Sequence, residues 1–183
     1  MRTPNANYSG AEMNMDNVNI DKSEFSGKNV VVAGGTSGIG LGIAERFADL
    51  DANVCVLSRN PDRVSAAARL LEEKGANALG IAADVRDYEA VERALREAYE
   101  RFGDIDVLVS GAAGNFLAPV IGLSPNAFRT VVEIDLIGTF NVFRASWEFL
   151  RRPGASLISI TAAQGSRPHV FQAHACAAKA GVN

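Results

Sequence analysis

The stretch Ala33-Gly34-Gly35-Thr36-Ser37-Gly38-Ile39-Gly40 decides how this chain folds. It directly follows an apolar β-branched run and opens an amphipathic stretch, and this strand–loop–helix context gives a glycine motif its meaning. Gly34 permits a tight turn, while Gly38 and Gly40 leave room for the backbone to approach a pyrophosphate, with helix N–H groups facing the anion. An ordinary turn is the alternative interpretation, but strand, loop and helix together favour a phosphate-binding loop.

From residue 29 onward, short β-branched runs alternate with longer amphipathic stretches, which is typical of βαβ units and a parallel sheet. The short runs predict strands over Asn29–Ala33, Asn53–Ser58, Ala78–Ala83, Asp106–Ser110 and Ser156–Thr161. The stretches between them predict helices over Ile39–Leu50, Pro61–Lys74, Tyr88–Phe102 and Asn126–Leu150. Right-handed crossovers then give an α/β fold of the Rossmann type, a doubly wound parallel sheet in the order 3-2-1-4-5 with helices on both faces.

The two ends of the chain differ from this pattern. Residues 1–26 are polar and rich in Asn, Ser and Gly, which predicts a disordered tail before one nucleotide-binding domain over residues 27–183. Met13 or Met15 is an alternative start of translation. His169–Asn183 begins a helix that has no capping signal and no strand after it, so we expect the domain to be incomplete at its C-terminus.

Composition and charge exclude several classes of protein. A chain of 183 residues, 48% of them apolar, can bury the core of one soluble domain. The net charge of −3 is spread without a basic stripe, which argues against nucleic acid and membrane surfaces as partners. No apolar run is long enough to span a membrane, and the start of the chain does not resemble a secretion signal.

The cysteine content indicates the compartment. Cys55 and Cys176 are the only cysteines, which is too few for a disulfide framework. Their spacing also does not match that of metal ligands, so we expect no metal site. A reducing compartment suits such a chain best, and we therefore expect the protein to be cytoplasmic.

The residues after the second predicted strand indicate which dinucleotide binds. Nucleotide-binding folds commonly place an acid there against the ribose 2′-hydroxyl, but this chain has Ser58 and Arg59. A guanidinium suits a 2′-phosphate, so the sequence predicts NADP(H) over NAD(H), the alternative being a solvated surface arginine. Asp84 and Val85 end the third strand where they would contact adenine, although Asp84 would serve equally as the cap of the next helix.

From about Phe25 to Asn183 the chain resembles the short-chain dehydrogenase/reductase family. The glycine loop, Asp84, the Ser110–Gly114 turn and Lys179 fall where that family has its motifs. A closer likeness to 2,4-dienoyl-CoA reductases, of the peroxisomal type and its bacterial relatives, lies in Gly111–Phe116, Ser124–Phe128, Asp135, Gly138–Asn141 and His174–Lys179.

The chain departs from the family at the active site. The resemblance implies a set of Asn, Ser, Tyr and Lys, in which the Tyr hydroxyl protonates a carbonyl and Lys lowers the pKa of that Tyr. The corresponding positions here hold Asp135, Ala162, Ala175 and Lys179, so only the lysine remains. These replacements argue against ordinary ketone–alcohol chemistry by that mechanism.

Reduction of a dienoyl thioester does not require a phenolic acid. Hydride added at the far end of the conjugated system places negative charge on the thioester oxygen, and water can then protonate carbon. The resemblance implies that Asp135 and Lys179 are catalytic, with Lys179 holding the nicotinamide ribose and Asp135 pairing with it to order a water. Asn115, Phe116 and Thr161 would bind substrate. The alternative for Asp135 is a structural helix acid, and the alternative for Lys179 is a solvated helix lysine. For Asn115 and Phe116 the alternative is a plain loop.

Together, the loop motif and the resemblance imply one set of cofactor-binding residues along the carboxyl edge of the sheet. The set comprises Gly34, Thr36, Ser37, Gly38, Ile39, Gly40, Ser58, Arg59, Asp84, Val85, Gly111, Ala112, Ala113 and Lys179. His174 is more often a packed or solvated helix histidine than a catalyst, but its closeness to Lys179 leaves a catalytic role open. Trp147 and Phe143 have helical spacing and predict a helix–helix or subunit surface.

Our leading hypothesis is an NADPH-dependent reductase of dienoyl- or enoyl-CoA thioesters in fatty-acid metabolism. We expect an acyl-CoA thioester as substrate and a homo-oligomer for the full-length form. Ala162 and Ala175 motivate the alternative, a pseudoenzyme or inactive fragment that binds NADP(H) without turnover.

Overall fold

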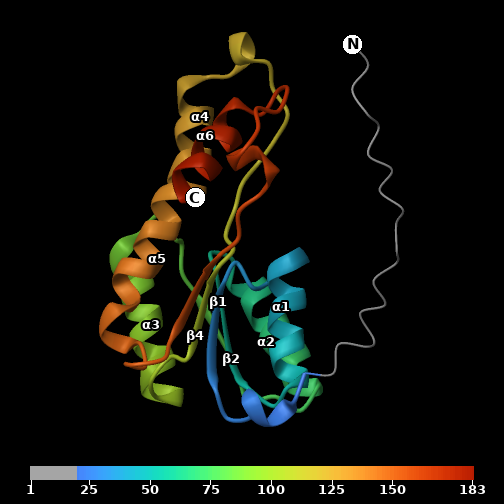
Figure 1. The fold of residues 1–183 in the computed structure, drawn as a ribbon, viewed down its shortest axis with the longest axis vertical. Coiled ribbons are helices and arrows are strands. Elements are labelled where there is room, and N and C mark those ends of the chain that lie inside the picture. The colour runs from blue at the N-terminus through green and yellow to red at the C-terminus, as the bar shows by residue number, and fades with distance from the viewer. Residues whose placement is uncertain (1–19) are drawn as a thin grey trace, which may run out of the picture.

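One parallel sheet organises the protein, as a computed structural model of residues 20–183 shows (Figure 1). The sheet has five strands in the order β3-β2-β1-β4-β5, and every neighbouring pair is parallel. The strands are β1 (Asn29–Ala33), β2 (Asn53–Ser58), β3 (Ala78–Ala82), β4 (Val107–Ser110) and β5 (Ser156–Ser159). The predicted fold class and strand order are confirmed.

Helices cover both faces of the sheet (Figure 1). On one face lie α1 (Gly38–Asp49) and α2 (Pro61–Glu73), and on the other lie α3 (Tyr88–Phe102) and α5 (Gly138–Ser146). Two further helices, α4 (Pro125–Val132) and α6 (Ala173–Val182), stand beyond the carboxyl ends of the strands. Short 3-10 turns complete the fold at η2 (Lys22–Glu24), η3 (Val120–Gly122), η5 (Trp147–Phe149) and η6 (Ala163–Gly165).

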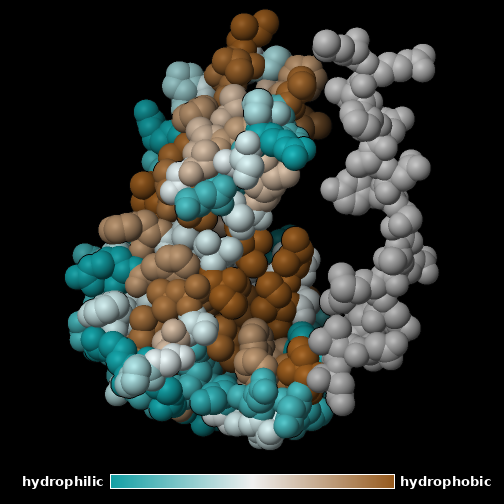
Figure 2. All heavy atoms as spheres, viewed as in Figure 1, coloured by the Kyte–Doolittle hydropathy of each residue, from teal (hydrophilic) through white to brown (hydrophobic). Residues whose placement is uncertain are grey.

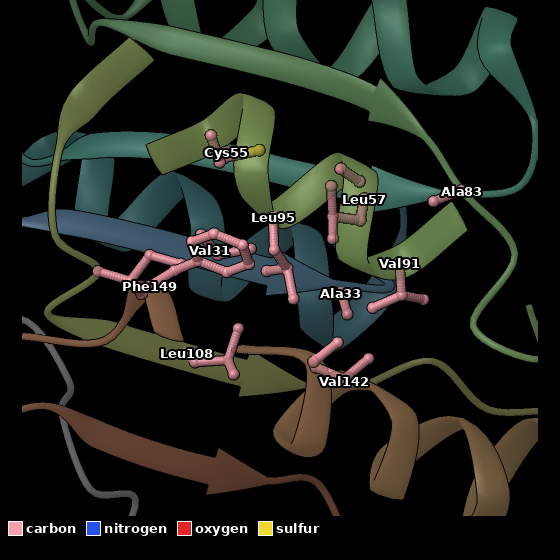
Figure 3. Packing of buried hydrophobic residues seen from close by; sticks show 14 of the residues in the cluster. Val31, Ala33, Cys55, Leu57, Ala83, Val91, Leu95, Leu108, Val142 and Phe149 are labelled. Carbon is pink, nitrogen blue, oxygen red and sulfur yellow. The ribbon is translucent and has the colours of Figure 1, made fainter. Parts of the chain in front are cut away.

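The buried side chains form two layers because successive residues of a strand point to opposite faces. On the α3 and α5 side, Val31 and Leu108 pack with Leu95 and Val142 (Figure 3). On the α1 and α2 side, Val30, Val32, Val54 and Val56 pack with Ala44, Ala48 and Leu71. A sheet that is apolar on both faces explains why the central strands read as continuous apolar runs.

The predicted helix over residues 126–150 differs most from the structure. It is divided into α4, a π-helical turn η4 (Glu133–Ile137), α5 and η5. The last helix starts at Ala173 rather than His169, because Phe171 just before it has a left-handed backbone with φ of 63°. The other boundaries agree within one or two residues, which is the usual spread at element ends.

The predicted tail is described only in part. The alternative starts at Met13 and Met15 lie outside the described residues, as does most of residues 1–26. Within the described part, Asp21 caps η2 and Phe25 packs edge-on against Phe47 of α1, with ring centroids 5.3 Å apart. Between residues 20 and 183, no helix is both long and apolar enough to cross a membrane.

Below the sheet, at the amino ends of the strands, Asp106 joins three segments. Its carboxylate accepts hydrogen bonds from the Asn29 N–H at 2.9 Å, from Lys28 Nζ at 3.4 Å and from the Arg151 guanidinium. Burial alone would raise the pKa of Asp106, but these hydrogen bonds and the charges of Arg151 and Lys28 outweigh it and lower the pKa. Asp106 therefore ties β1 to β4 and to the segment before β5.

We expect Asp106→Asn to lower the free energy of unfolding at neutral pH by about 2 kcal/mol, the scale of a hydrogen bond to a charged group. Because the folded pKa is lowered, this stabilisation is present above the unfolded pKa of about 4 and is lost as the pH falls through the folded value. Urea unfolding should therefore show the two proteins converging below about pH 4.

The matched control is Asp104→Asn, since the Asp104 carboxylate also contacts Arg151, at 3.6 Å, but is 47% exposed. An exposed pair contributes about 0–1 kcal/mol, so this change should have little effect. Equal losses for the two variants would contradict the assignment of Asp106 as the buried tie.

Candidate active site

A cleft of about 480 Å³ opens at the carboxyl ends of the strands. It lies between the sheet and the part that carries α4 and α6, where Figure 2 shows the surface hollowed. Its walls come from the segments after all five strands and from α6. The lining residues are Gly34, Thr36, Ser37, Ile39, Gly40, Leu57, Ser58, Arg59, Arg63, Ala83, Asp84, Val85, Gly111, Ala112, Ala113, Gly114, Ile134, Ile160, Thr161, Ala162 and Lys179.

Most of the predicted site residues meet in this cleft. Four do not line it, namely Gly38, Asn115, Phe116 and Asp135. Asn115 and Phe116 turn toward the segment before α6 and its first turn instead: the Asn115 amide donates to Gln172 Oε1 at 2.8 Å, and Phe116 stacks on His174. Asp135 does not line the cleft itself but pairs with Lys179, which does. That Asn115 and Phe116 bind substrate therefore stays a prediction.

The glycines of the loop after β1 are required by close backbone contacts. A Cβ on Gly40 would lie 2.2 Å from the Gly34 carbonyl oxygen, and a Cβ on Gly34 would lie 2.6 Å from the Ala112 nitrogen. Gly34 and Gly38 also have φ values of 82° and 53°, a region that favours glycine. A Cβ on Gly38 would meet nothing within 4 Å.

The start of α1 is left open to a ligand. Helices α2, α3 and α4 each begin with a side-chain cap, from Asn60, Asp87 and Ser124 respectively. At α1 the capping position is Ser37, whose side chain makes no hydrogen bond to the first turn. The first N–H groups of α1 therefore remain available, and together with the helix dipole they suit an anion such as a pyrophosphate.

Two arginines flank the far end of the cleft. Arg59 follows β2, and Arg63 lies one turn further, in the first turn of α2. Both line the cleft and are exposed. The sequence prediction included Arg59 but missed Arg63, although a spacing of four residues at a helix start would place the two side chains on the same side.

The Asp84 carboxylate binds the Arg86 side chain and does not cap a helix. The Arg86 guanidinium contacts both carboxylate oxygens, with Nη2 2.6 Å from Oδ2. Hydrogen bonding from Arg86 lowers the pKa of Asp84 more than burial raises it, and the charge of Arg59 acts in the same direction. The alternative of Asp84 as a helix cap is wrong, because Asp87 caps α3 through the Ala90 N–H.

Asp135 and Lys179 form a buried ion pair. Lys179 Nζ lies 3.4 Å from Asp135 Oδ2 and donates to the Ile160 carbonyl at 3.0 Å. Asp135 Oδ1 accepts the Gly114 N–H at 2.7 Å. The side chains are 2% and 10% exposed for Asp135 and Lys179 respectively, so the alternative of a solvated helix lysine is wrong.

The environment of Asp135 raises its pKa above that of an exposed aspartate. Burial raises the pKa of Asp135, and this outweighs the lowering effects of the Gly114 N–H and the Lys179 ammonium. The carboxyl group is therefore a stronger proton acceptor than an exposed aspartate. A carboxyl so placed beside a cleft lysine is a candidate for holding or moving a proton.

The π-helical turn directs Asp135 inward. An extra residue in a helical turn rotates the side chains that follow, and π turns often occur at functional sites. The Thr139 hydroxyl donates to the Asp135 carbonyl at 2.7 Å, which satisfies an acceptor beside the turn. Gly138 permits close packing there, because a Cβ would lie 2.6 Å from Val85 Cγ2.

Comparison with known proteins gives relatives for this geometry. The family model described as short chain dehydrogenase matches residues 28–183. A peroxisomal 2,4-dienoyl-CoA reductase of Rattus norvegicus is 46% identical over 158 residues, which are 85% of this chain and 54% of that protein. A probable 2,4-dienoyl-CoA reductase of Bacillus subtilis is 35% identical over 159 residues, 85% of this chain and 62% of that protein.

Among solved structures, a variant of actinorhodin polyketide ketoreductase with NADPH is 31% identical with a TM-score of 0.81. The match covers 85% of this chain and 60% of that one. The chain spans about half the length of the curated relatives it matches.

We expect Gly40→Ala to destabilise the protein by about 1–3 kcal/mol or more, because the new methyl group meets backbone that cannot move aside without shifting α1. Gly42→Ala is the matched control, since Gly42 lies in the same helix and its Cβ would meet nothing within 4 Å. That change should stabilise by about 0.5–1 kcal/mol through helix propensity. Denaturant unfolding measures both, and similar effects of the two changes would contradict the close contact.

Proposed function

The chain belongs to the short-chain dehydrogenase family, and from this premise we propose that it is an NADPH-dependent oxidoreductase that reduces dienoyl- or enoyl-CoA thioesters in fatty-acid metabolism. The observation that carries the proposal is the set of residues in and beside the cleft. It contains the Asp135–Lys179 pair, but Ala162 and Ala175 stand where the family resemblance places hydroxyl groups. The 2,4-dienoyl-CoA reductases among the relatives support the same substrate class.

The loop after β1 fits the pyrophosphate of a nicotinamide dinucleotide. Glycines fill the three places, Gly34, Gly35 and Gly40, where a Cβ would collide with backbone, and the first turn of α1 lacks a side-chain cap. The ribose of the nicotinamide half would lie against Lys179, and adenine against Asp84 and Val85. A bound cofactor of this class supplies the hydride that the reduction consumes.

The remaining chemistry falls to the substrate, water and the chain. Hydride adds to the carbon at the far end of the conjugated system, and the electron pair it displaces moves to the thioester oxygen. A proton from water then adds to carbon, so that one C=C bond is reduced overall. The chain must orient the thioester and place hydrogen-bond donors at its oxygen. The buried Asp135, whose pKa is raised, would hold the water that gives this proton.

Arg59 and Arg63 favour NADPH over NADH. A 2′-phosphate carries negative charge that a pair of guanidinium groups can bind, whereas a 2′-hydroxyl gains little from them. Neither side chain is tied up in an ion pair within residues 20–183, and both line the cleft. We therefore assign the 2′-phosphate to the space between them.

The function predicts oxidation of NADPH on addition of hexadienoyl-CoA, with little oxidation on addition of a ketoacyl-CoA. The reason is that carbonyl reduction requires a proton donor at the ketone oxygen, which the two alanines do not supply. NADPH absorbance gives the rates. Turnover of the ketoacyl-CoA alone would contradict the proposal, and binding of NADPH without turnover of either thioester would indicate a pseudoenzyme.

The same assay tests the ion pair. Asp135→Ala and Lys179→Ala should each lower turnover of hexadienoyl-CoA by about 10²-fold or more, and the double variant should lose much less than the product of the two. Such non-additivity is expected when two groups act as a unit. Multiplicative losses, or normal turnover of Asp135→Ala, would make Asp135 a structural acid.

We expect Arg59→Asp to weaken binding of NADPH by about 1–3 kcal/mol and binding of NADH far less, since only the former loses a charge-assisted contact. Isothermal titration with each dinucleotide measures the difference. Arg69→Asp is the matched control, because it makes the same charge change on exposed α2 surface outside the cleft. Equal weakening of both dinucleotides by Arg59→Asp would overturn the 2′-phosphate assignment.

A further inference from the structure

His174 is a polar side chain buried without partners. It lies in the first turn of α6, is 0% exposed, and both ring nitrogens lack a hydrogen bond within residues 20–183. A neutral imidazole has one donor and one acceptor. Burying such groups unsatisfied is unfavourable, so the fold carries a cost here that a bound polar group would remove.

Phe116 covers the imidazole. The two rings stack with centroids 4.4 Å apart and planes inclined by 28°, and Phe116 is itself 43% exposed. The loop that carries Phe116 is fixed on both sides of it. Gly114 N–H binds Asp135, and Ala118 N–H binds the Phe171 carbonyl, so that this loop runs beside the segment before α6 (Figure 1). The backbone is therefore held on both sides of Phe116, while its ring lies at the surface over the imidazole.

The other donors near the cleft have less to gain from a substrate. Lys179 Nζ already pairs with the Asp135 carboxylate and donates to the Ile160 carbonyl, and the Asn115 amide donates to Gln172. The Thr161 hydroxyl is exposed, so water satisfies it before substrate arrives. The imidazole of His174 has no hydrogen-bond partner among residues 20–183 and is 0% exposed, so a ligand oxygen would satisfy one of its nitrogens.

The position of His174 relates it to the reacting group. It is adjacent to Ala175, which stands where the family resemblance places the proton-donating tyrosine, and it lies near enough to Asp135 to affect that carboxyl group electrostatically. The thioester oxygen requires a donor as negative charge develops on it. Without the hydroxyl groups at positions 162 and 175, that donor must come from elsewhere in the site.

We propose that His174 donates this hydrogen bond to the thioester oxygen of the acyl-CoA, and that the side chain of Phe116 moves aside to admit it. The inference rests on the proposed function and adds a substrate-contacting residue to it. Phe116 is then a cover that shields the imidazole when the acyl group is absent.

The test exploits opposite effects on stability and turnover. His174→Phe keeps an aromatic ring to stack on Phe116 and removes both unsatisfied nitrogens, so its melting temperature should equal or exceed that of the wild type. Its kcat for hexadienoyl-CoA should fall by about 10²-fold, as for loss of one oxyanion donor, while binding of NADPH stays unchanged. His174→Gln, which retains an N–H donor, should recover part of the lost kcat.

If His174 only packs in the core, His174→Phe should keep full turnover. That outcome, with an active wild type, would overturn the inference and leave the proposed function standing. A wild-type protein that reduces no dienoyl-CoA would instead overturn the proposed function and this inference with it.

A second measurement needs no variant at position 174. The chain has two histidines, so NMR of isotope-labelled histidine gives two sets of ring-nitrogen signals, and His169→Asn assigns them. Saturated hexanoyl-CoA, which cannot be reduced, should shift the His174 signals in the presence of NADP⁺ and leave those of the exposed His169 unchanged. Binding of hexanoyl-CoA without a His174 shift would overturn the proposed contact.

Discussion

The site depends on one constraint, which is close backbone contact among three segments. These are the loop after β1, the start of α1 and the loop after β4. Gly40 meets Gly34, and Gly34 meets Ala112, at separations that leave no space for a Cβ. These contacts set α1 directly against the sheet and bring the second loop beside the first. Three segments converge at this edge through close backbone contacts, so the glycines shape this wall of the cleft.

The opposite side of the cleft depends on charge rather than on close contact. The Asp135–Lys179 pair joins the π-helical turn to α6, and its hydrogen bonds extend to Gly114 and to the Ile160 carbonyl. Removing two charges from water is expensive unless each finds good partners, and a pair of this kind is weak evidence for added stability. Its place beside a cleft is more readily understood through chemistry, since burial raises the pKa of the carboxyl group and Lys179 lines the cleft.

The sequence predicts much of this fold and less of the site. Runs such as Val30–Val32 predict buried parallel strands because both faces must be covered, and the glycine loop predicts its own backbone shape. The π-helical turn could not be predicted from periodicity, since it depends on tertiary contacts such as Gly138 against Val85. The contact of Phe116 with His174 is equally non-local, and the sequence does not decide whether that histidine is packed or solvated. Arg63 could have been predicted, since it lies four residues after Arg59 at the start of a predicted helix.

The hydrogen bond from the Gly114 N–H to Asp135 couples the position of the loop after β4 to the protonation of the Asp135 carboxyl group. That bond is one of the influences that lower the pKa of the carboxyl group, acting against burial. A displacement of the loop that breaks it would make Asp135 bind a proton more tightly, and by thermodynamic reciprocity protonation of Asp135 would favour the displaced loop. Any change that breaks this hydrogen bond is therefore linked to proton uptake by Asp135, so the protonation state of one buried carboxyl reports on whether the bond to Gly114 is made.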